Sequence, residues 1–321
     1  MPEHRPARDH VNIGRAPSTA EKEIVRKHIL HMLTPLAHMS PFDVNMALDA
    51  GFDAVVPYVG VGPGEVTGLV QDAIFSRPPD AGVDTGIFIG GKDVSLALDM
   101  FDAARKAMVP PFQVSVFADP AGSFTTAAAM VAKTEKALEK KFERGLKDTR
   151  IAVFGATGVV GFCTAVIAAK EGARVTIVGH DGVERVKKVA DEIKARFGVD
   201  VEPEDGSTEA KKRALAEKAE VILTAAKAGV QVISKEQLSA AGKLLIASDV
   251  NAVPPAGIEG LAVNANAEPL ETTKAVGIGP LAVGNVKYKV EFGLFKRMIE
   301  SEKTVTFDFQ DAFSFAREIA K

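Results

Sequence analysis

The sequence predicts an α/β protein of two α/β domains with a cleft between them, and three observations carry this prediction. The length of 321 residues is typical of two domains. Short apolar runs of strand length alternate with longer segments of helical periodicity along most of the chain. In mid-chain, a glycine-rich turn joins an apolar run at residues 151–154 to helix-compatible residues 162–169.

The composition excludes several classes of protein. With 46% hydrophobic and 25% charged residues, the chain resembles ordinary soluble domains. The net charge is −3, and the lysines and arginines are scattered, so the sequence does not indicate the basic patch of a nucleic-acid-binding protein. No apolar stretch reaches the ~20 residues of a membrane span, and no signal peptide is recognisable. The single cysteine, Cys163, is expected in the core. We therefore expect a cytoplasmic protein that has no metal site and binds neither nucleic acid nor membrane.

The first domain is predicted at residues 28–146, after a polar extension at residues 1–27. Its expected strands are residues 29–33, 54–59, 86–91 and 113–117. Its expected helices are residues 41–50, 66–75, 93–108 and one that ends near residue 142. For the first helix, Ser40 is a suitable N-cap, Pro41 a suitable first residue and Gly51 a suitable stop.

Two features of this domain suggest a ligand site. Phe42 lies in the first turn of a helix, at the mouth of a strand–helix junction, although packing in the core is the alternative. Ser123, Thr125 and Thr126 crowd the loop beyond the strand at 113–117. One hydroxyl would suffice to cap the next helix, so three hydroxyls are more than a cap requires. Because ligands bind at the carboxyl ends of parallel strands, these residues are candidates for a ligand site.

The glycine-rich turn has the spacing G-x-x-G-x-x-G and opens the second domain, predicted at residues 147–287. Gly155 would permit the tight turn, Gly158 the close approach of a pyrophosphate, and Gly161 close helix–strand packing. A glycine-rich turn in any parallel-sheet protein is the alternative. The residues expected to meet the phosphates of a cofactor are Gly155, Thr157, Gly158, Val159, Val160 and Gly161.

The next strand, residues 174–178, indicates which cofactor binds. It ends at His180 and Asp181, where a dinucleotide site needs an acid for the adenosine ribose. Arg185 would supply positive charge for a 2′-phosphate, or it is part of a solvated helix face. We therefore expect NAD or NADP.

The remaining segments predict a Rossmann-type doubly wound parallel sheet. The expected strands are residues 200–203, 221–225, 244–248 and 261–264, and the expected helices are 182–197, 207–218 and 234–240. Ala225 and Lys227 follow one strand on the nucleotide side. Asp249 and Asn251 follow another, with Asp249 either a turn-former or a ligand group.

Farther on, Lys287 and Glu291 share a helix face at i, i+4, a spacing typical of a surface ion pair. A helix at residues 307–320 is expected to return to the first domain, which segment 288–321 would complete.

Several long motifs make the chain similar to a known family. Residues 31–36, 39–45, 86–91, 117–126 and 248–255 resemble methylene-tetrahydromethanopterin dehydrogenases, bacterial NAD(P)-dependent enzymes of one-carbon metabolism. The similarity runs from about residue 28 to the C-terminus. NADP-specific relatives have an arginine where this chain has His180, so the resemblance is to the branch that accepts both NAD and NADP.

The resemblance implies hydride transfer from the methylene carbon of methylene-tetrahydromethanopterin to NAD(P)+, giving the methenyl cation, in the formaldehyde oxidation of methylotrophy. It also implies a homo-oligomer, a trimer or a multiple of it, without metal. The alternatives are a methylene-tetrahydrofolate dehydrogenase and a non-catalytic NAD(P)-binding protein.

By motif, Phe42 would pack against the pterin and Thr126 would line the substrate site. Lys287 aligns with the family's active-site lysine, whereas Glu291 stands where relatives have a histidine. Either Glu291 or Asp249 would place negative charge near the developing cation. The candidate catalytic residues are Lys287, Thr126, Glu291 and Asp249, and the candidate substrate-binding residues are Phe42, Ser123, Thr125 and Asn251.

Overall fold

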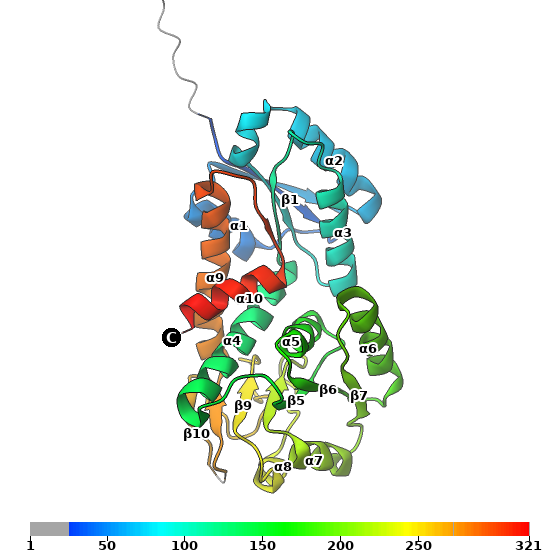
Figure 1. Cartoon of the computed structure of the whole chain (residues 1–321), viewed down its shortest axis with the longest axis vertical. Helices are drawn as coiled ribbons and strands as arrows, with labels where there is room; N and C mark the ends of the chain where they lie inside the picture. The colour runs from blue at the N-terminus through cyan, green and yellow to red at the C-terminus, as the bar shows by residue number, and fades with distance from the viewer. Residues whose placement is uncertain (1–25, 272, 321) are drawn as a thin grey trace, which may run out of the picture.

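The computed structural model describes residues 26–271 and 273–320, so almost all of the predicted extension at 1–27 lies outside the described residues. Two sheets form two lobes along the long axis, with the first in blue and cyan and the second in green and yellow (Figure 1). Within the described ranges, no helix is both long and apolar enough to cross a bilayer. The predicted α/β class with two domains is confirmed.

The first sheet has five parallel strands in the order β12-β4-β3-β1-β2. Its strands are β1 (Ile29–Thr34), β2 (Ala54–Val59), β3 (Thr85–Ile89), β4 (Ser115–Ala118) and β12 (Thr306–Phe307). The helical segments between them are α1 (Pro41–Ala50), α2 (Pro63–Phe75), η1 (Pro79–Asp84), α3 (Val94–Lys106), η2 (Pro120–Gly122) and α4 (Ser123–Phe142). The strand order reverses between β1 and β3, and in such sheets a crevice forms at the carboxyl ends of those two strands.

The second sheet has seven strands in the order β10-β11-β9-β8-β5-β6-β7. They are β5 (Arg150–Phe154), β6 (Arg174–Gly179), β7 (Glu202–Asp205), β8 (Val221–Thr224), β9 (Ile246–Asp249), β10 (Asn266–Pro269) and β11 (Val276–Ile278). Its helices are α5 (Val159–Lys170), α6 (Glu184–Phe197), α7 (Glu209–Lys218) and α8 (Lys235–Ala240). Without the antiparallel edge strand β10, this is the Rossmann order, which reverses between β5 and β8.

The C-terminal segment joins the two lobes. Helix α9 (Pro280–Glu300) starts beside β11 of the second sheet and packs on α1 and α4 of the first lobe. It is one continuous helix, so the boundary predicted at residue 287 falls inside it. Strand β12 then pairs with β4, and α10 (Phe309–Ile319) packs on α4 and α9 (Figure 1).

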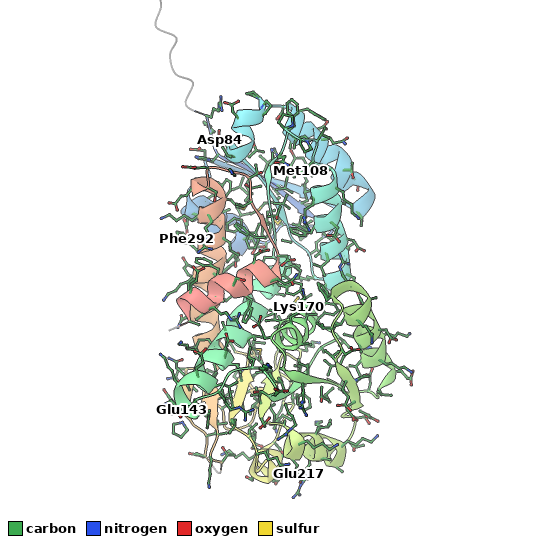
Figure 2. All side chains as sticks on the ribbon, viewed as in Figure 1. Asp84, Met108, Glu143, Lys170, Glu217 and Phe292 are labelled. Carbon is green, nitrogen blue, oxygen red and sulfur yellow. The ribbon has the colours of Figure 1, made fainter. Side chains whose placement is uncertain are left out.

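Polar contacts also cross between the lobes. Arg196 of α6 forms ion pairs with Asp99 and Asp102 of α3, at 2.7 and 2.8 Å. Figure 2 shows Lys170 of α5 beside α10, where it donates a hydrogen bond to Gln310. Cys163 is wholly buried, as expected.

Capping explains why α1 was predictable. The Ser40 hydroxyl accepts a hydrogen bond from the Asp43 backbone N–H at 3.4 Å, Pro41 is the first helical residue, and Gly51 ends the helix with a φ of +115°.

The expected strand at residues 261–264 is wrong. The chain is irregular there, and the next strands are β10 and β11. Strand β10 has the polar sequence Asn-Ala-Glu-Pro and a register shift at Ala267, whose φ is +60°. A short polar edge strand lacks the apolar alternation that marks a strand in sequence.

Candidate active site

A cavity of about 620 Å³ opens at the carboxyl ends of β1 and β3, where the first sheet reverses its order. The loop after β1 with the start of α1, the loop after β3 and η2 supply its wall, to which α9 adds one lysine. The lining residues are Thr34, 36–43, 90–92, Ala121 and Lys287. This is the position at which an open α/β sheet binds a ligand.

Phe42 lies in the first turn of α1 and faces this cavity with 46% of its surface exposed. Packing in the core, the alternative considered from sequence, is therefore wrong. The ammonium of Lys287 lies 3.8 Å from the centre of the Phe42 ring, which is within the range of a cation–π contact. The two side chains thus form one wall of the cavity together.

Lys287 and Glu291 of α9 form an ion pair between Nζ and Oε2. The expectation of a surface pair is wrong, because the Glu291 side chain is wholly buried and that of Lys287 is 14% exposed. Gly122 allows the lysine to lie there: a Cβ on Gly122 would lie 2.7 Å from Nζ of Lys287, and the φ of Gly122 is +64°.

Two buried aspartates that sequence reasoning missed complete this cluster. Asp43 and Asp119 are 2% and 0% exposed, and both act electrostatically on Glu291. Burial raises the pKa of Asp43 to about 7 and that of Glu291 to about 8, and it also raises the pKa of Asp119. Asp119 directly follows a buried strand, and this position was the available signal for it.

The hydroxyl loop serves mainly to hold Asp119. Thr125 is wholly buried and donates to Asp119 Oδ2 at 2.6 Å, while the backbone N–H groups of Phe124 and Thr125 donate to Oδ1. Thr125 therefore holds Asp119 in place, and its contact with substrate stays a prediction. Ser123 and Thr126 are half-buried, and Thr126 donates to the Gly122 carbonyl at 2.6 Å.

A second cavity, of about 600 Å³, lies at the switch point between β5 and β8. Six of the predicted cofactor residues line it: Gly155, Thr157, Gly158, His180, Ala225 and Lys227. Sequence reasoning missed other lining residues, which include Gly206, Lys212, Ala226 and Gln231. They come from the loops after β7 and β8 and from α7, whose closeness depends on the fold.

The three glycines of the turn have different roles. Gly155 has a φ of +90°, and a Cβ there would lie 2.4 Å from the Ala225 carbonyl oxygen. A Cβ on Gly161 would lie 2.4 Å from the Gly155 carbonyl oxygen, so this glycine lets α5 pack against the turn. A Cβ on Gly158 would lie 3.5 Å from the Gly155 carbonyl oxygen, which is an ordinary van der Waals contact. Val159, Val160 and Gly161 belong to the first turn of α5, outside the lining of the cavity.

At the end of β6, Asp181 and Arg185 pair with each other at 2.9 Å on the exposed surface. The hydrogen bond from Arg185 lowers the pKa of Asp181. Neither residue is part of the lining of the cavity, whereas the neighbouring His180 is.

Asp249 and Asn251 are 1% and 5% exposed and organise the loop after β9. Asp249 accepts hydrogen bonds from Thr224 Oγ1 at 2.7 Å and from the Gly257 N–H at 2.8 Å. The Asn251 amide donates to the Pro255 carbonyl at 3.0 Å. Burial raises the pKa of Asp249. The hydrogen bonds of both side chains are made within this loop, β8 and the loop after β8. Their expected catalytic and substrate-binding roles stay predictions.

In the part of the chain that the structure describes, no three His, Cys, Asp or Glu side chains are arranged to hold a metal ion.

The decisive comparison is with a protein of Methylorubrum extorquens AM1. That protein, named NAD(P)-dependent methylenetetrahydromethanopterin dehydrogenase, is 58% identical over 294 residues, which span 92% of this chain and 99% of the relative. This chain belongs to the methylenetetrahydromethanopterin dehydrogenase family. The model of the N-terminal domain of methylene-tetrahydromethanopterin dehydrogenase matches residues 41–121.

A more distant family relative and two solved structures extend the comparison. The bifunctional protein MdtA of the same bacterium is 30% identical over 92% of this chain and 99% of its own. Ornithine transcarbamoylase from Giardia lamblia is 13% identical with a TM-score of 0.52, covering 86% of each chain. Entamoeba histolytica malic enzyme is 13% identical with a TM-score of 0.50, covering 91% of this chain and 75% of its own. At such identities, the two structures show a shared fold only.

Proposed function

We propose that this protein transfers a hydride from the methylene carbon of methylene-tetrahydromethanopterin to NAD+ or NADP+, which leaves the methenyl cation. The relative that is 58% identical carries this activity in its name. The observation that carries the proposal within the structure is the wall of Lys287 and Phe42 in a cavity at the switch point of the first sheet.

The second cavity suits a nicotinamide dinucleotide. Helix α5 starts at Val159 without a side-chain cap, which leaves N–H groups free for a pyrophosphate, and Gly158 leaves room for close approach. A nicotinamide nucleotide bound there supplies the hydride acceptor. We propose dual use of NAD and NADP, because His180 lines the cavity and Asp181 and Arg185 offer partners for a ribose hydroxyl and a phosphate, respectively.

Helix α9 runs from the second sheet to the first cavity, where Lys287 lines the wall. It begins at Pro280, directly beyond β11 at the carboxyl edge of the nucleotide sheet, and reaches Lys287 after two turns. Two turns of helix span about 10 Å. We propose that the substrate and the nucleotide meet in the cleft between the domains, beside this stretch of α9.

The chemistry requires positioning and charge. The carbon that loses hydride lies between two nitrogens, which share the resulting positive charge, so no general base is needed. The exposed Phe42 ring offers a flat apolar face to a pterin, and Lys287 fixes the orientation of its polar edge. The carboxylates around Lys287 provide negative charge that stabilises the developing cation. We assign this role to the cluster that contains Glu291 and no longer to Asp249.

The family resemblance supports three further proposals. We propose that the protein is a homo-oligomer, a trimer or a multiple of it, that it acts in the cytoplasm, and that it serves formaldehyde oxidation in methylotrophic one-carbon metabolism. We also propose that Ser123 and Thr126 line the substrate site, because both are half-buried at the start of α4 beside Gly122.

Replacing Lys287 by alanine tests the proposed site. We expect kcat/KM for the methanopterin substrate to fall by about 100-fold or more, the scale on which a positioned charge contributes to catalysis. Lys289→Ala on the exposed side of the same helix is the matched control and should retain activity. Unchanged kinetics in Lys287→Ala would refute the assignment.

A further inference from the structure

Three carboxyl groups surround one lysine in the buried cluster. The charged groups that face Glu291 are Asp119 between β4 and η2, Asp43 of α1 and Lys287 of its own helix. All three acids are at most 2% exposed. Three buried negative charges against one positive charge would leave two carboxylates without a counter-charge, which is costly away from water.

The hydrogen bonds indicate which carboxyl groups hold a proton. Asp119 has three fixed donors, namely the N–H groups of Phe124 and Thr125 and the hydroxyl of Thr125, and these favour its ionised form. Glu291 has only Lys287 at Oε2. Its Oε1 is wholly buried and has no donor among the described residues. The proton is therefore more stable on the side of Glu291 than on Asp119.

Asp43 lies in the same buried cluster, close enough to Glu291 for each carboxyl group to influence the pKa of the other. Two carboxyl groups form a hydrogen bond only when one of them carries the proton, because an ionised carboxylate has no donor. A proton between them would also satisfy the buried Oε1 of Glu291.

We propose that Asp43 and Glu291 share one proton, and that this acid–carboxylate pair positions Lys287 over the Phe42 ring. The inference deepens the proposed function, on which it rests for its catalytic meaning. Asp43 and Glu291 are here positioning residues that act through Lys287. With the proton in place, the cluster directs one net negative charge at the cation that forms on the substrate.

Loss of the shared proton should disturb the site. With both acids ionised, Asp43 and Glu291 repel each other, and the lysine loses the geometry that places it over Phe42. The raised pKa values, about 7 for Asp43 and about 8 for Glu291, place this loss near neutral or mildly alkaline pH. We therefore expect kcat/KM to fall as the pH rises through this range.

Infrared spectroscopy of the purified full-length protein tests the proton directly, without any need for activity. We expect the wild type to show the carbonyl band of a protonated carboxylic acid that disappears on titration across the two pKa values. Asp43→Asn and Glu291→Gln should each abolish this titrating band, because the introduced amide donates in place of the shared proton. Glu300→Gln, at an exposed position of the same helix, is the matched control and should retain it.

Kinetic measurements test whether the shared proton positions Lys287. The pH dependence of kcat/KM should flatten in Asp43→Asn and Glu291→Gln, whatever the absolute activity, and should remain in Glu300→Gln. A wild type without the titrating band would overturn the proposal even if neither variant folded, and so would a band that persists in both. If the protein lacked dehydrogenase activity, the proposed function would fail while the infrared result still decided whether the proton is shared.

Discussion

At the scale of single residues, Gly122 determines how closely Lys287 approaches the start of α4. Gly122→Ala would place a methyl group 2.7 Å from Nζ and 2.8 Å from Cε of the lysine. We expect the lysine to move off the Phe42 ring and kcat to fall by about 10-fold or more, because misplacement of about 1 Å has large effects on catalysis. Steady-state kinetics with the methanopterin substrate measures the change.

Gly198→Ala is the control for backbone strain. Gly198 ends α6 with a φ of +69°, close to the +64° of Gly122, but a Cβ there would meet nothing within 4 Å. Both variants should lose about 1 kcal/mol of stability, and only Gly122→Ala should lose activity. Equal activity in the two variants would show that the position of Lys287 does not matter.

Glu291 should also make stability depend on pH. Burial raises its pKa from the usual 4.5 to about 8, so the folded state binds the proton more tightly than the unfolded state. This contribution favours folding below the unfolded-state pKa and is lost as the pH rises toward the folded-state value. Glu291→Gln cannot lose a proton, so its free energy of unfolding should fall less over that window, by on the order of 1–3 kcal/mol.

Urea unfolding at several pH values measures this difference. Glu300→Gln should show the same pH slope as the wild type, since Glu300 is exposed and pairs with Lys296 on the surface. If Glu291→Gln kept the wild-type slope, Glu291 would be ionised in the folded state.

How much of this site was predictable varies from residue to residue. Lys287 and Phe42 were identified because their motifs resemble those of the family, and both line the cavity. Asp43 and Asp119 were missed, although Asp119 follows a strand, because their effect depends on burial against α9, which lies far away in sequence. Asp249 had the same sequence signal as Asp119, but its hydrogen bonds hold its own loop.

At the scale of elements, two glycines of the turn into α5 have different roles, one in packing and one in nucleotide binding. Gly161→Ala would place a Cβ 2.4 Å from backbone at Gly155, whereas Gly158→Ala would meet only an ordinary contact in a region that lines the nucleotide cavity. We expect Gly161→Ala to lose about 1–3 kcal/mol of stability through overpacking. Gly158→Ala should stay folded and raise the KM for NAD+ and NADP+.

Thermal unfolding and nucleotide titration distinguish these outcomes. The reverse pattern, with Gly158→Ala unfolded and Gly161→Ala intact, would contradict the roles assigned to the two glycines.

Local signals explain which elements were predictable. Helix α1 was found because Ser40, Pro41 and Gly51 mark its ends in sequence. Strand β10 was missed because its sequence is polar, and β11 and β12 were missed because they are only three and two residues long. β12 exists because its backbone pairs with β4, some 190 residues earlier, and no local pattern records such a pairing.

At the scale of the whole molecule, Phe309 joins the two lobes. This wholly buried ring of α10 lies 5.3 Å from the Phe124 ring of α4 and 5.4 Å from the Phe197 ring of α6. Phe309→Ala should lower the free energy of unfolding by about 3–5 kcal/mol, as expected for a large buried aromatic side chain. Phe75→Ala, at a site with 55% exposure, should cost far less when both are compared by urea unfolding.

A small loss in Phe309→Ala, equal to that in Phe75→Ala, would mean that the lobes are stabilised independently of α10. The junction matters for function because α9, which carries Lys287 and Glu291, and α4, whose first residues donate hydrogen bonds to Asp119, both pack against this helix.

The central claim is that this protein oxidises methylene-tetrahydromethanopterin with either nicotinamide nucleotide. The most direct test follows NADH and NADPH formation by the purified protein, with the methanopterin and tetrahydrofolate substrates each paired with NAD+ and NADP+. We predict reduction of both nucleotides with the methanopterin substrate. Activity with the folate substrate alone would contradict the proposed substrate, and nucleotide binding without reduction in any pairing would contradict the proposed enzymatic function.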